Sequence, residues 1–212
     1  MILNSPQCGG THAVIQILKT LGLSIRGRHR DGIWYPKMKG RRKKYPKTHG
    51  GRLIDKEFQP LLLPGQFITG HSSPFETRIP VLCNLRDPRN IAICQSRRGR
   101  ALPFLAWLKS DRSKPYLSKM IQNWDWHGEH VLRIWYEELQ EKSTQLKIAD
   151  FCGAPWRRVD IYGYGRTWSG KPSDYKTKFD AETHSVWDAV WFKITKQSWQ
   201  TWWVENGNPS WQ

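Results

Sequence analysis

The chain has 212 residues, enough for one α/β domain with a substantial buried core. Its 34 lysine and arginine residues against 18 aspartate and glutamate residues give a formal net charge of +16, which indicates an anionic partner. No apolar stretch is long enough to span a bilayer, and the apolar start has neither the basic region nor the cleavage site of a signal peptide, so we expect a cytoplasmic protein.

The first predicted elements are a buried strand over residues 1–5 and a helix over residues 11–21. Residues 7–12 form a tight turn between them, with glycines at Gly9 and Gly10. Glycines let a backbone approach a ligand closely, and the first N–H groups of a helix lie unpaired at the positive end of its dipole. The turn is therefore a candidate phosphate or sulfate site, with an ordinary strand–helix corner as the alternative.

A basic segment follows, with eleven lysines and arginines and one aspartate over residues 26–52. We interpret residues 24–53 as an insertion in the fold. Three interpretations stay open: a solvated loop, a flap that attracts an anionic acceptor such as a sulfated or carboxylated glycan, and a nucleic-acid clamp. In the last of these, the basic run at residues 41–44 would contact phosphates and the neighbouring aromatic rings would stack on bases.

Apolar runs farther along the chain predict strands over residues 65–71, 78–85 and 130–136. Helices are expected to begin near residues 90, 116 and 143. Strands that alternate with helices predict a three-layer α/β sandwich around a mostly parallel sheet. We expect residues 1–212 to form a single domain, with the basic insertion at about 24–53 and a Trp-rich C-terminal helix at about 181–205.

Aromatic residues of the last helix recur near helical spacing, which predicts that they pack this helix on the body of the protein. A flat surface that stacks on a sugar or steroid ring is the alternative. The residues concerned are Trp187, Trp191, Phe192, Trp199, Trp202 and Trp203.

Four cysteines are scattered along the chain without a C-x-x-C pair, which favours free thiols over disulfides or a zinc site. Cys83 is predicted to lie in a buried strand. Cys8 has the place of a phosphatase nucleophile at a helix N-terminus, but the arginine that such a site needs after the glycines is absent.

Polar residues follow the predicted strands directly. Because ligands of parallel sheets bind beyond the carboxyl ends of the strands, we expect residues 7–12, His71, Arg86 and Tyr136 to surround one site. Asp87 has an alternative role as the N-cap of the next helix. Glu137 and the following Glu138 resemble a pair of carboxylates, but adjacent residues at a strand end point apart, which favours a structural role.

Several stretches match one family in the family's own order, from residue 1 to about residue 179. The turn P-Q-C-G-G-T-H resembles the 5′-phosphosulfate loop of the sulfotransferases that use 3′-phosphoadenosine 5′-phosphosulfate (PAPS). T-G-H-S-S-P-F resembles the segment that carries their catalytic histidine, and L-R-D-P-R-N-I-A-I-C resembles their 3′-phosphate motif. R-I-W-Y-E-E-L, F-C-G-A-P and T-W-S-G-K-P-S-D-Y-K resemble a later strand, a turn and a Gly-Lys loop of the family.

The resemblance implies a P-loop-NTPase-like sulfotransferase fold and in-line transfer of a sulfuryl group from PAPS to a hydroxyl or amine acceptor, without a metal. The product would be adenosine 3′,5′-bisphosphate (PAP), and the acceptor an anionic glycan or an aromatic small molecule. His71 is the implied general base, since an imidazole with a pKa near ~6.5 is available in its neutral form. The implied nucleotide-binding residues are Gln7, Cys8, Gly9, Gly10, Thr11 and His12 at the 5′ end, Arg86, Cys94 or Ser96, Arg166, Ser169, Gly170 and Lys171 at the 3′-phosphate, and Tyr136 at the adenosine.

Two positions depart from the family pattern. Gln7 stands where the family has the loop lysine, so either another basic side chain replaces it or the activity is low. Cys94 stands where the family has a serine, and Ser96 is the nearest hydroxyl. The missing lysine also speaks against a P-loop kinase. A nucleic-acid-binding protein and a sulfotransferase fold of low activity remain the alternatives for the whole chain.

Overall fold

The computed structural model describes residues 1–25, 28–30, 33–35, 62–71, 74, 76–98, 102–161 and 175–207. Most of the predicted basic insertion lies outside the described residues. The same holds for four predicted nucleotide-binding residues, namely Arg166, Ser169, Gly170 and Lys171.

Five parallel strands form the central sheet, in the order β2-β5-β1-β6-β7. Four of them confirm the strands predicted from apolar runs. The fifth, β2, lies inside the segment that was interpreted as an insertion and pairs with β5, so residues 24 and 25 belong to the sheet instead. The strands are β1 (Ile2–Asn4), β2 (Ser24–Ile25), β5 (Gln66–Gly70), β6 (Val81–Leu85) and β7 (Val131–Trp135).

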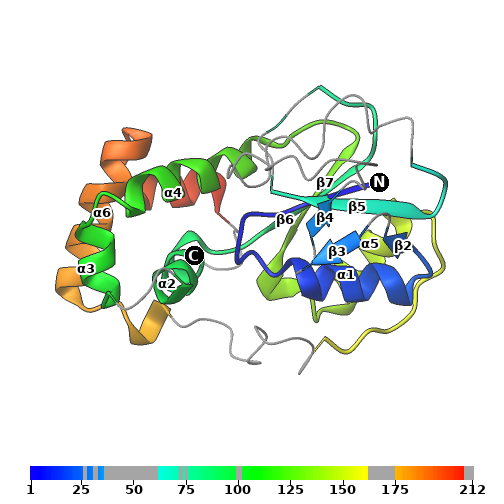
Figure 1. The fold of residues 1–212 in the computed structure, drawn as a ribbon, viewed down its shortest axis with the longest axis horizontal. Helices are drawn as coiled ribbons and strands as arrows, with labels where there is room; N and C mark the ends of the chain where they lie inside the picture. Colours follow the sequence, from blue (N-terminus) through cyan, green and yellow to red (C-terminus); the bar gives the residue numbers. More distant parts are fainter. Residues whose placement is uncertain are drawn as a thin grey trace, which may run out of the picture.

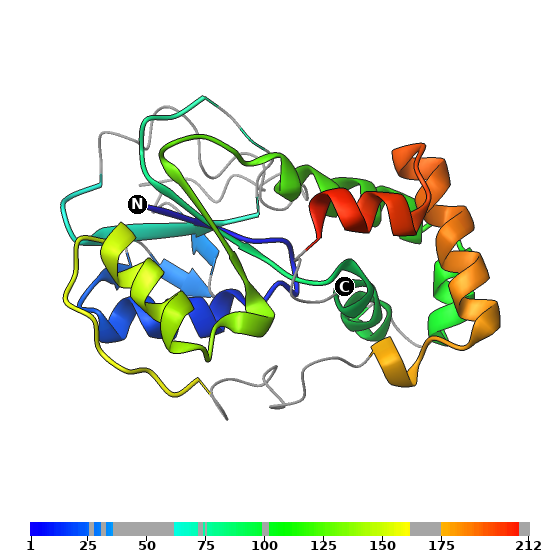
Figure 2. The ribbon, with the colours of Figure 1, turned by 180° about the vertical axis from the view of Figure 1, so that it is seen from behind.

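Helices cover both faces of this sheet. Ile2 packs in one core with α2 (Pro88–Arg98), whereas Leu3 packs in a second core with α1 (Thr11–Thr20) and α5 (Lys142–Phe151). Adjacent residues enter different cores because side chains alternate along a strand. Figure 2 shows α1 and α5 together on one side of the sheet. The predicted three-layer α/β sandwich is therefore confirmed.

The neighbouring strands β1 and β6 lead into helices on opposite faces. The helix α1 follows β1 and packs in the core of Leu3, whereas α2 follows β6 and packs in the core of Ile2. In open parallel sheets, such a divergence marks the place where a ligand binds, beyond the carboxyl ends of the two strands. The predicted site is centred on this point.

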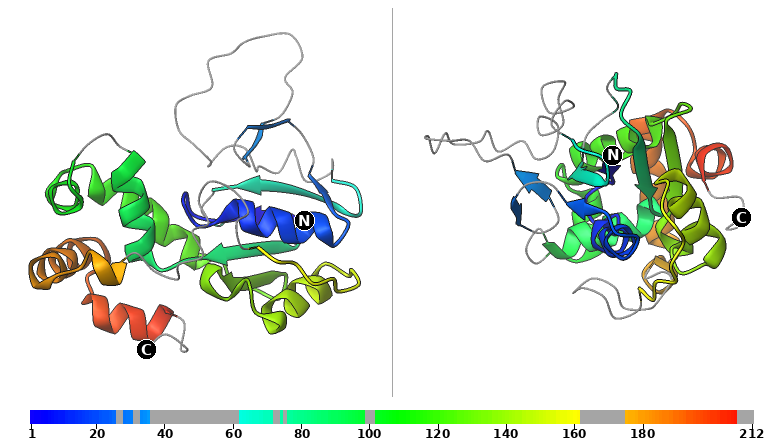
Figure 3. Two further views of the ribbon diagram at one scale, coloured as in Figure 1. Left: turned by 90° about the horizontal axis from the view of Figure 1, so that it is seen from below. Right: turned by 90° about the vertical axis from the view of Figure 1, so that its right-hand side faces the viewer.

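A second group of helices lies beyond the carboxyl ends of the strands, so that β1 runs from the N-terminus toward it (Figure 1). Figure 3 shows the same group from below, set beside the sheet. Within this group, the helix over residues 104–109 is the one described element that has no counterpart in the prediction. The group consists of α3 (Phe104–Lys109), α4 (Ser113–Ile121), the 3₁₀ turn η2 (Gln122–Asp125), α6 (Ala181–Thr195) and α7 (Trp199–Asn206).

The single C-terminal helix predicted over residues 181–205 is wrong, because two helices occupy this range. Lys196 adopts the left-handed conformation, with φ 64°, and ends α6. The Ser198 hydroxyl then accepts a hydrogen bond from the Thr201 N–H at 3.1 Å and caps α7. A left-handed residue is a common helix stop, and serine is a favoured N-cap.

The C-terminal tryptophans form a buried cluster. The ring of Trp191 lies 4.8 Å from those of Trp199 and Trp202, in edge-on contacts that aromatic pairs favour. The predicted packing role is wrong for Phe192, which is 54% exposed. It is confirmed for the residues that are at most 8% exposed, Trp187, Trp191, Trp199, Trp202 and Trp203.

The remaining described elements are short. An antiparallel hairpin of β3 (Arg28–Arg30) and β4 (Ile33–Tyr35) lies beside β5, and single turns form at η3 (Tyr136–Glu138) and η4 (Tyr175–Thr177). No helix within the described ranges has the length and apolar character needed to cross a membrane. All four cysteines are free thiols, and burial in β6 raises the pKa of Cys83 to about 12.

Replacement of Trp191 by alanine should lower the free energy of unfolding by roughly 3–5 kcal/mol, because it leaves a large cavity at the centre of the tryptophan cluster. Phe192→Ala is the matched control, since that neighbouring ring is exposed and its loss should cost less than about 1 kcal/mol. Urea denaturation, monitored by far-UV circular dichroism instead of tryptophan fluorescence, measures both losses. Equal losses for the two variants would contradict the packing described above.

Candidate functional site

The loop between β1 and α1 requires both of its glycines. Gly10 has φ 88°, in the left-handed region, and a Cβ added to it would stand 2.0 Å from a ring carbon of Tyr136. A Cβ on Gly9 would stand 2.7 Å from the carbonyl oxygen of Pro6. Gly10 is thus packed against η3, and Gly9 against Pro6, so closely that no side chain fits at either position.

The amino end of α1 opens onto this loop without a side-chain cap. Its N-cap is Gly10, and the first turn holds no acidic residue. Two donors that the sequence suggested for an anion are engaged elsewhere. The Gly9 N–H donates to the Pro6 carbonyl at 2.8 Å, and the Thr11 hydroxyl shares a 2.5 Å hydrogen bond with the Ser5 hydroxyl. The first turn of α1, where helix N–H groups lack intrahelical acceptors, therefore offers the donors that could bind an anion at this loop.

His71 directly follows β5 and is 8% exposed. Its Nδ1 lies 2.5 Å from the carbonyl oxygen of Ser5, which begins the loop. A carbonyl oxygen only accepts, so Nδ1 carries the hydrogen, and in the neutral ring the lone pair then resides on Nε2. The Ser5 N–H in turn donates to the Gly70 carbonyl at 3.2 Å, which fixes His71 to the start of the loop.

Arg86 directly follows β6 and reaches the same loop. Its terminal NH1 group donates to the Cys8 carbonyl at 2.8 Å, and its guanidinium carbon lies 4.5 Å from the centroid of the Tyr136 ring. The Nε–H of Arg86 is buried and has no hydrogen-bond partner among the residues that the structure describes. The predicted loop and the predicted strand-end arginine are therefore in direct contact.

Tyr136 lies between these groups and is 5% exposed. Its ring packs closely against Gly10 and also lies under the guanidinium of Arg86. Burial raises the pKa of its hydroxyl well above the ordinary value. The ring that the resemblance assigns to the adenosine thus also forms the support beneath the loop.

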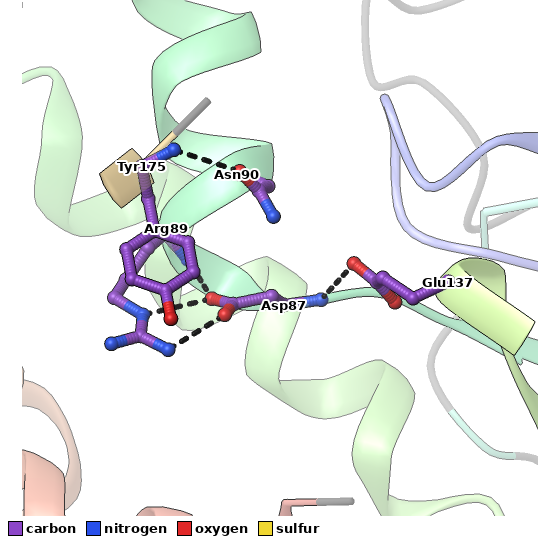
Figure 4. Close-up of polar contacts among 5 residues, drawn as sticks. All are labelled: Asp87, Arg89, Asn90, Glu137 and Tyr175. Carbon is purple, nitrogen blue, oxygen red and sulfur yellow. Dashed lines mark hydrogen bonds and ion pairs between the residues drawn. The ribbon is translucent and has the colours of Figure 1, made fainter. Parts of the chain in front are cut away.

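The adjacent Glu137 is partly exposed as a residue, but its carboxyl group is enclosed by protein. Its Oε1 accepts a hydrogen bond from the Asp87 N–H at 3.3 Å (Figure 4). Burial raises the pKa of this carboxyl group to about 7, against the opposing effect of the Arg86 charge. Glu137 therefore joins the turn η3, which follows β7, to the residue before α2, in agreement with the structural role favoured by the sequence.

Asp87 begins α2 and is nearly completely buried. Its Oδ1 accepts from the Arg89 N–H at 2.8 Å, which confirms Asp87 as the N-cap. The Arg89 side chain donates to both carboxylate oxygens, at 3.1 and 2.7 Å, and its guanidinium lies 3.6 Å from the centroid of the Tyr175 ring. Figure 4 shows this arrangement. Arg89 thus neutralises the charge of Asp87 beside the site.

Two further residues hold the loop in place, and the sequence analysis did not identify them. Asn84 Nδ2 donates to the Gly9 carbonyl at 2.5 Å, and the Tyr116 hydroxyl donates to the Gln7 carbonyl at 3.0 Å. The signal for Asn84 was a polar residue inside the apolar run of β6. Tyr116 had no such signal, because its partner is 109 residues away in the chain.

The predicted phosphate ligands on α2 differ in their surroundings. Cys94 is partly exposed and close enough to Tyr136 to affect its pKa. Ser96 is 4% exposed, and its hydroxyl donates to the Ile93 carbonyl at 2.8 Å. Of the two alternatives, Cys94 is therefore the one beside the site. On α1, His12 has an exposed side chain.

Two buried hydrogen-bond donors at this site lack an acceptor, on Asn90 and on Arg86. Asn90 is 2% exposed, and its Oδ1 accepts from the Tyr175 N–H at 3.2 Å (Figure 4). Its Nδ2 group, like the Nε–H of Arg86, is a buried donor without a partner within the described part of the chain. Buried donors without acceptors are rare and costly, and a phosphate or sulfate group would supply the acceptors.

Comparison with solved structures gives a likeness over nearly the whole chain. The fold resembles the crystal structure of mouse sulfotransferase SULT7A1 complexed with PAP, with a TM-score of 0.51 and 16% sequence identity, over 93% of this chain and 84% of that one. No protein-family model matches the sequence, and no curated protein matches it either. The chain has the sulfotransferase fold. The resemblance drawn from its motifs is thus confirmed at the level of the fold.

Gly10→Ala should destabilise the protein by at least about 2 kcal/mol more than Gly22→Ala. Both glycines have a positive φ, 88° and 91°, but a Cβ on Gly22 meets nothing within 4 Å, whereas a Cβ on Gly10 meets the Tyr136 ring. The control therefore carries the backbone strain alone, roughly 1 kcal/mol, and the test variant adds overpacking. Chemical denaturation of both variants checks this. Similar losses would mean that the loop does not pack on Tyr136.

Glu137→Gln should stabilise the protein at pH 8 and much less at pH 5. The pKa of the buried carboxyl group is raised to about 7, so its ionisation opposes folding as the pH rises from the unfolded pKa of about 4.5 through 7. The stability gain of the variant should grow by roughly 2 kcal/mol between these two pH values. Glu138→Gln, at the next and partly exposed position, is the control. A pH-independent difference for Glu137→Gln would refute the effect of burial.

Proposed function

We propose that this protein binds PAPS beyond the carboxyl ends of β1 and β6 and transfers its sulfuryl group to a hydroxyl or amine acceptor, with His71 as the general base. The sulfotransferase fold and the order of the sequence motifs support this proposal. The PAP bound in the mouse structure supports the choice of nucleotide.

The observation that carries the proposal is the hydrogen bond between His71 Nδ1 and the Ser5 carbonyl, at 2.5 Å. It selects the tautomer whose Nε2 can accept a proton, as a general base requires. It also ties this base to the first residue of the loop between β1 and α1.

Bound PAPS would supply a sulfuryl group, whose bond to the 5′-phosphate oxygen breaks as a bond to the acceptor oxygen or nitrogen forms. The amino end of α1 would hold the 5′ end of the nucleotide through backbone N–H groups and the helix dipole. Arg86 would bind the 3′-phosphate at the other end of the nucleotide, with a full positive charge and fixed donors. His71 would take the proton that the acceptor loses.

The excess of basic residues supports an acceptor that carries negative charge. A net charge of +16 attracts anionic molecules from solution and speeds their encounter with the protein. We therefore propose an anionic glycan as the acceptor, with an aromatic small molecule as the alternative.

A thermal-shift titration tests the nucleotide part of the proposal. PAP should raise the melting temperature at concentrations at which ADP, AMP and a short oligonucleotide have a clearly smaller effect. The reason is that the proposed site binds one phosphate group at the 3′ position and another at the 5′ position of the same adenosine. A shift produced by the oligonucleotide alone would instead support the nucleic-acid-binding alternative and end the proposal.

His71→Ala should leave PAP affinity within about threefold of the wild type and lower the turnover of sulfuryl transfer by ~10²-fold or more, the usual contribution of a general base. The matched control is His130→Ala, which removes an imidazole just before β7. This residue lies at the amino end of its strand, away from the carboxyl ends that form the site. Calorimetry and transfer of radiolabelled sulfate measure the two quantities. Unchanged turnover in His71→Ala would remove this residue from its proposed role.

A further inference from the structure

Three successive carbonyl groups of the loop between β1 and α1 accept hydrogen bonds from side chains of other elements. The pairs of donor and accepting carbonyl are Tyr116 with Gln7, Arg86 with Cys8, and Asn84 with Gly9. In a trans peptide the carbonyl and the N–H that follows it point in opposite directions, and the described part of the chain holds no cis peptide bond. Each of these side chains therefore fixes the direction of one loop N–H as well.

We infer that Tyr116 is a positioning residue of the sulfuryl-transfer site, which orients the loop without touching the nucleotide. Its hydroxyl sets the peptide plane that joins Gln7 to Cys8, at the place where the family pattern has its lysine. This inference rests on the proposed function. It gives α4 a part in nucleotide binding that no motif in the sequence indicates.

Tyr116 reaches the loop from a different part of the fold than the other two donors. Asn84 lies in β6 and Arg86 directly follows that strand, whereas Tyr116 lies on α4, in the group of helices beyond the carboxyl ends of the strands (Figure 1). The loop backbone is therefore held both from the sheet and from the helical group. Removal of the Tyr116 hydroxyl would remove the contact from α4 at Gln7 and leave the two contacts from the sheet in place.

The position of the Tyr116 hydroxyl is itself fixed by the fold. The Tyr116 ring packs on the core around α2 and meets the Trp107 ring edge-on, with 6.4 Å between the centroids. The far end of α4 is tied to β1, because Asn123 of the following turn η2 accepts a hydrogen bond from Asn4 Nδ2 at 2.8 Å. Asn4 is the last residue of β1, so α4 and η2 contact the chain just before the loop as well as within it. A donor that is supported in this way can hold its acceptor in one orientation.

The direction of the loop peptides matters because the loop has few other means to bind an anion. Residues 7–12 include no lysine or arginine, and the Gly9 N–H is already paired with the Pro6 carbonyl. Peptide dipoles attract an anion through their N–H ends and repel it through their carbonyl ends. A Gln7 carbonyl that turned toward the site would therefore weaken binding, and the hydrogen bond from the Tyr116 hydroxyl opposes this rotation.

Tyr116→Phe tests the inference, because it removes the hydroxyl and keeps the ring. The affinity for adenosine 5′-phosphate should fall about three- to tenfold, since the loop would hold the 5′ group. The affinity for adenosine 3′-phosphate, which lacks that group, should change by less than about twofold. Competition against labelled PAP measures both affinities.

The matched control is Ser113→Ala, on the same helix. The Ser113 hydroxyl is buried and donates to the carbonyls of Leu108 and Ser110, at 2.8 and 2.9 Å, instead of to the loop. Its removal should lower the stability of α4 but change neither mononucleotide affinity by more than about twofold. Far-UV circular dichroism and the melting temperature show that each variant is folded before its binding is measured.

A second measurement reports on the loop itself. Cys8 is a partly exposed free thiol next to Gln7, and Cys152 is a partly exposed free thiol just after α5, in contact with Met1. In Tyr116→Phe, alkylation by iodoacetamide should become about threefold faster or more at Cys8 and stay unchanged at Cys152, because only the loop gains freedom to open. Mass spectrometry of tryptic peptides separates the two sites.

Four outcomes would overturn the inference. They are an unchanged affinity for adenosine 5′-phosphate in the folded Tyr116→Phe variant, equal losses for the two mononucleotides, the same losses in Ser113→Ala, and an unchanged alkylation rate at Cys8. The wild type tests the proposed function separately. If it does not bind PAP, the proposed function fails and this inference fails with it, whereas normal PAP binding with an unaffected Tyr116→Phe variant ends only the inference.

Discussion

The contact between the guanidinium of Arg86, the Cys8 carbonyl and the Tyr136 ring determines the form of the whole site. These residues follow β6, β1 and β7, so the contact joins the ends of three strands that lie side by side in the sheet. It exists because the parallel order brings all their carboxyl ends to one edge. His71 completes the arrangement from β5, on the other side of β1, through its hydrogen bond to Ser5.

The positive charge of Arg86 at this contact is only partly offset by the neighbouring carboxyl groups. Asp87 is neutralised by Arg89, and burial raises the pKa of Glu137 to about 7, so neither carboxyl group fully offsets Arg86. The amino end of α1 adds a partial positive charge at the same place. The edge of the sheet therefore keeps an excess of positive charge and of buried donors, which is unfavourable in the absence of an anion and favourable in its presence. Such a site lowers the free energy of unfolding of the ligand-free protein, and a bound anion would raise it again.

The fold could be predicted where the signal is local. Apolar runs marked four of the five strands, and the glycines of the first turn marked the loop. The strand β2 was missed because two residues carry no periodicity, and its place at the edge depends on pairing with β5. The break between α6 and α7 was missed because Lys196 is not a typical helix stop, whereas the structure places it in the left-handed conformation between two helices whose tryptophans pack together. With the mouse sulfotransferase the chain shares the fold, at 16% sequence identity.

The amino-acid sequence by itself determined which residues follow strands, and so which side chains gather at the carboxyl edge of the sheet, since parallel strands end on the same side. It determined the absence of a lysine from the loop and the large positive net charge. Only the tertiary structure decided that Arg86, Asn84 and Tyr116 donate hydrogen bonds to carbonyls of the loop, and that the Ser96 hydroxyl donates to the Ile93 carbonyl of its own helix. Such contacts join residues far apart in the chain, and they depend on the relative placement of whole elements, which no local spacing specifies.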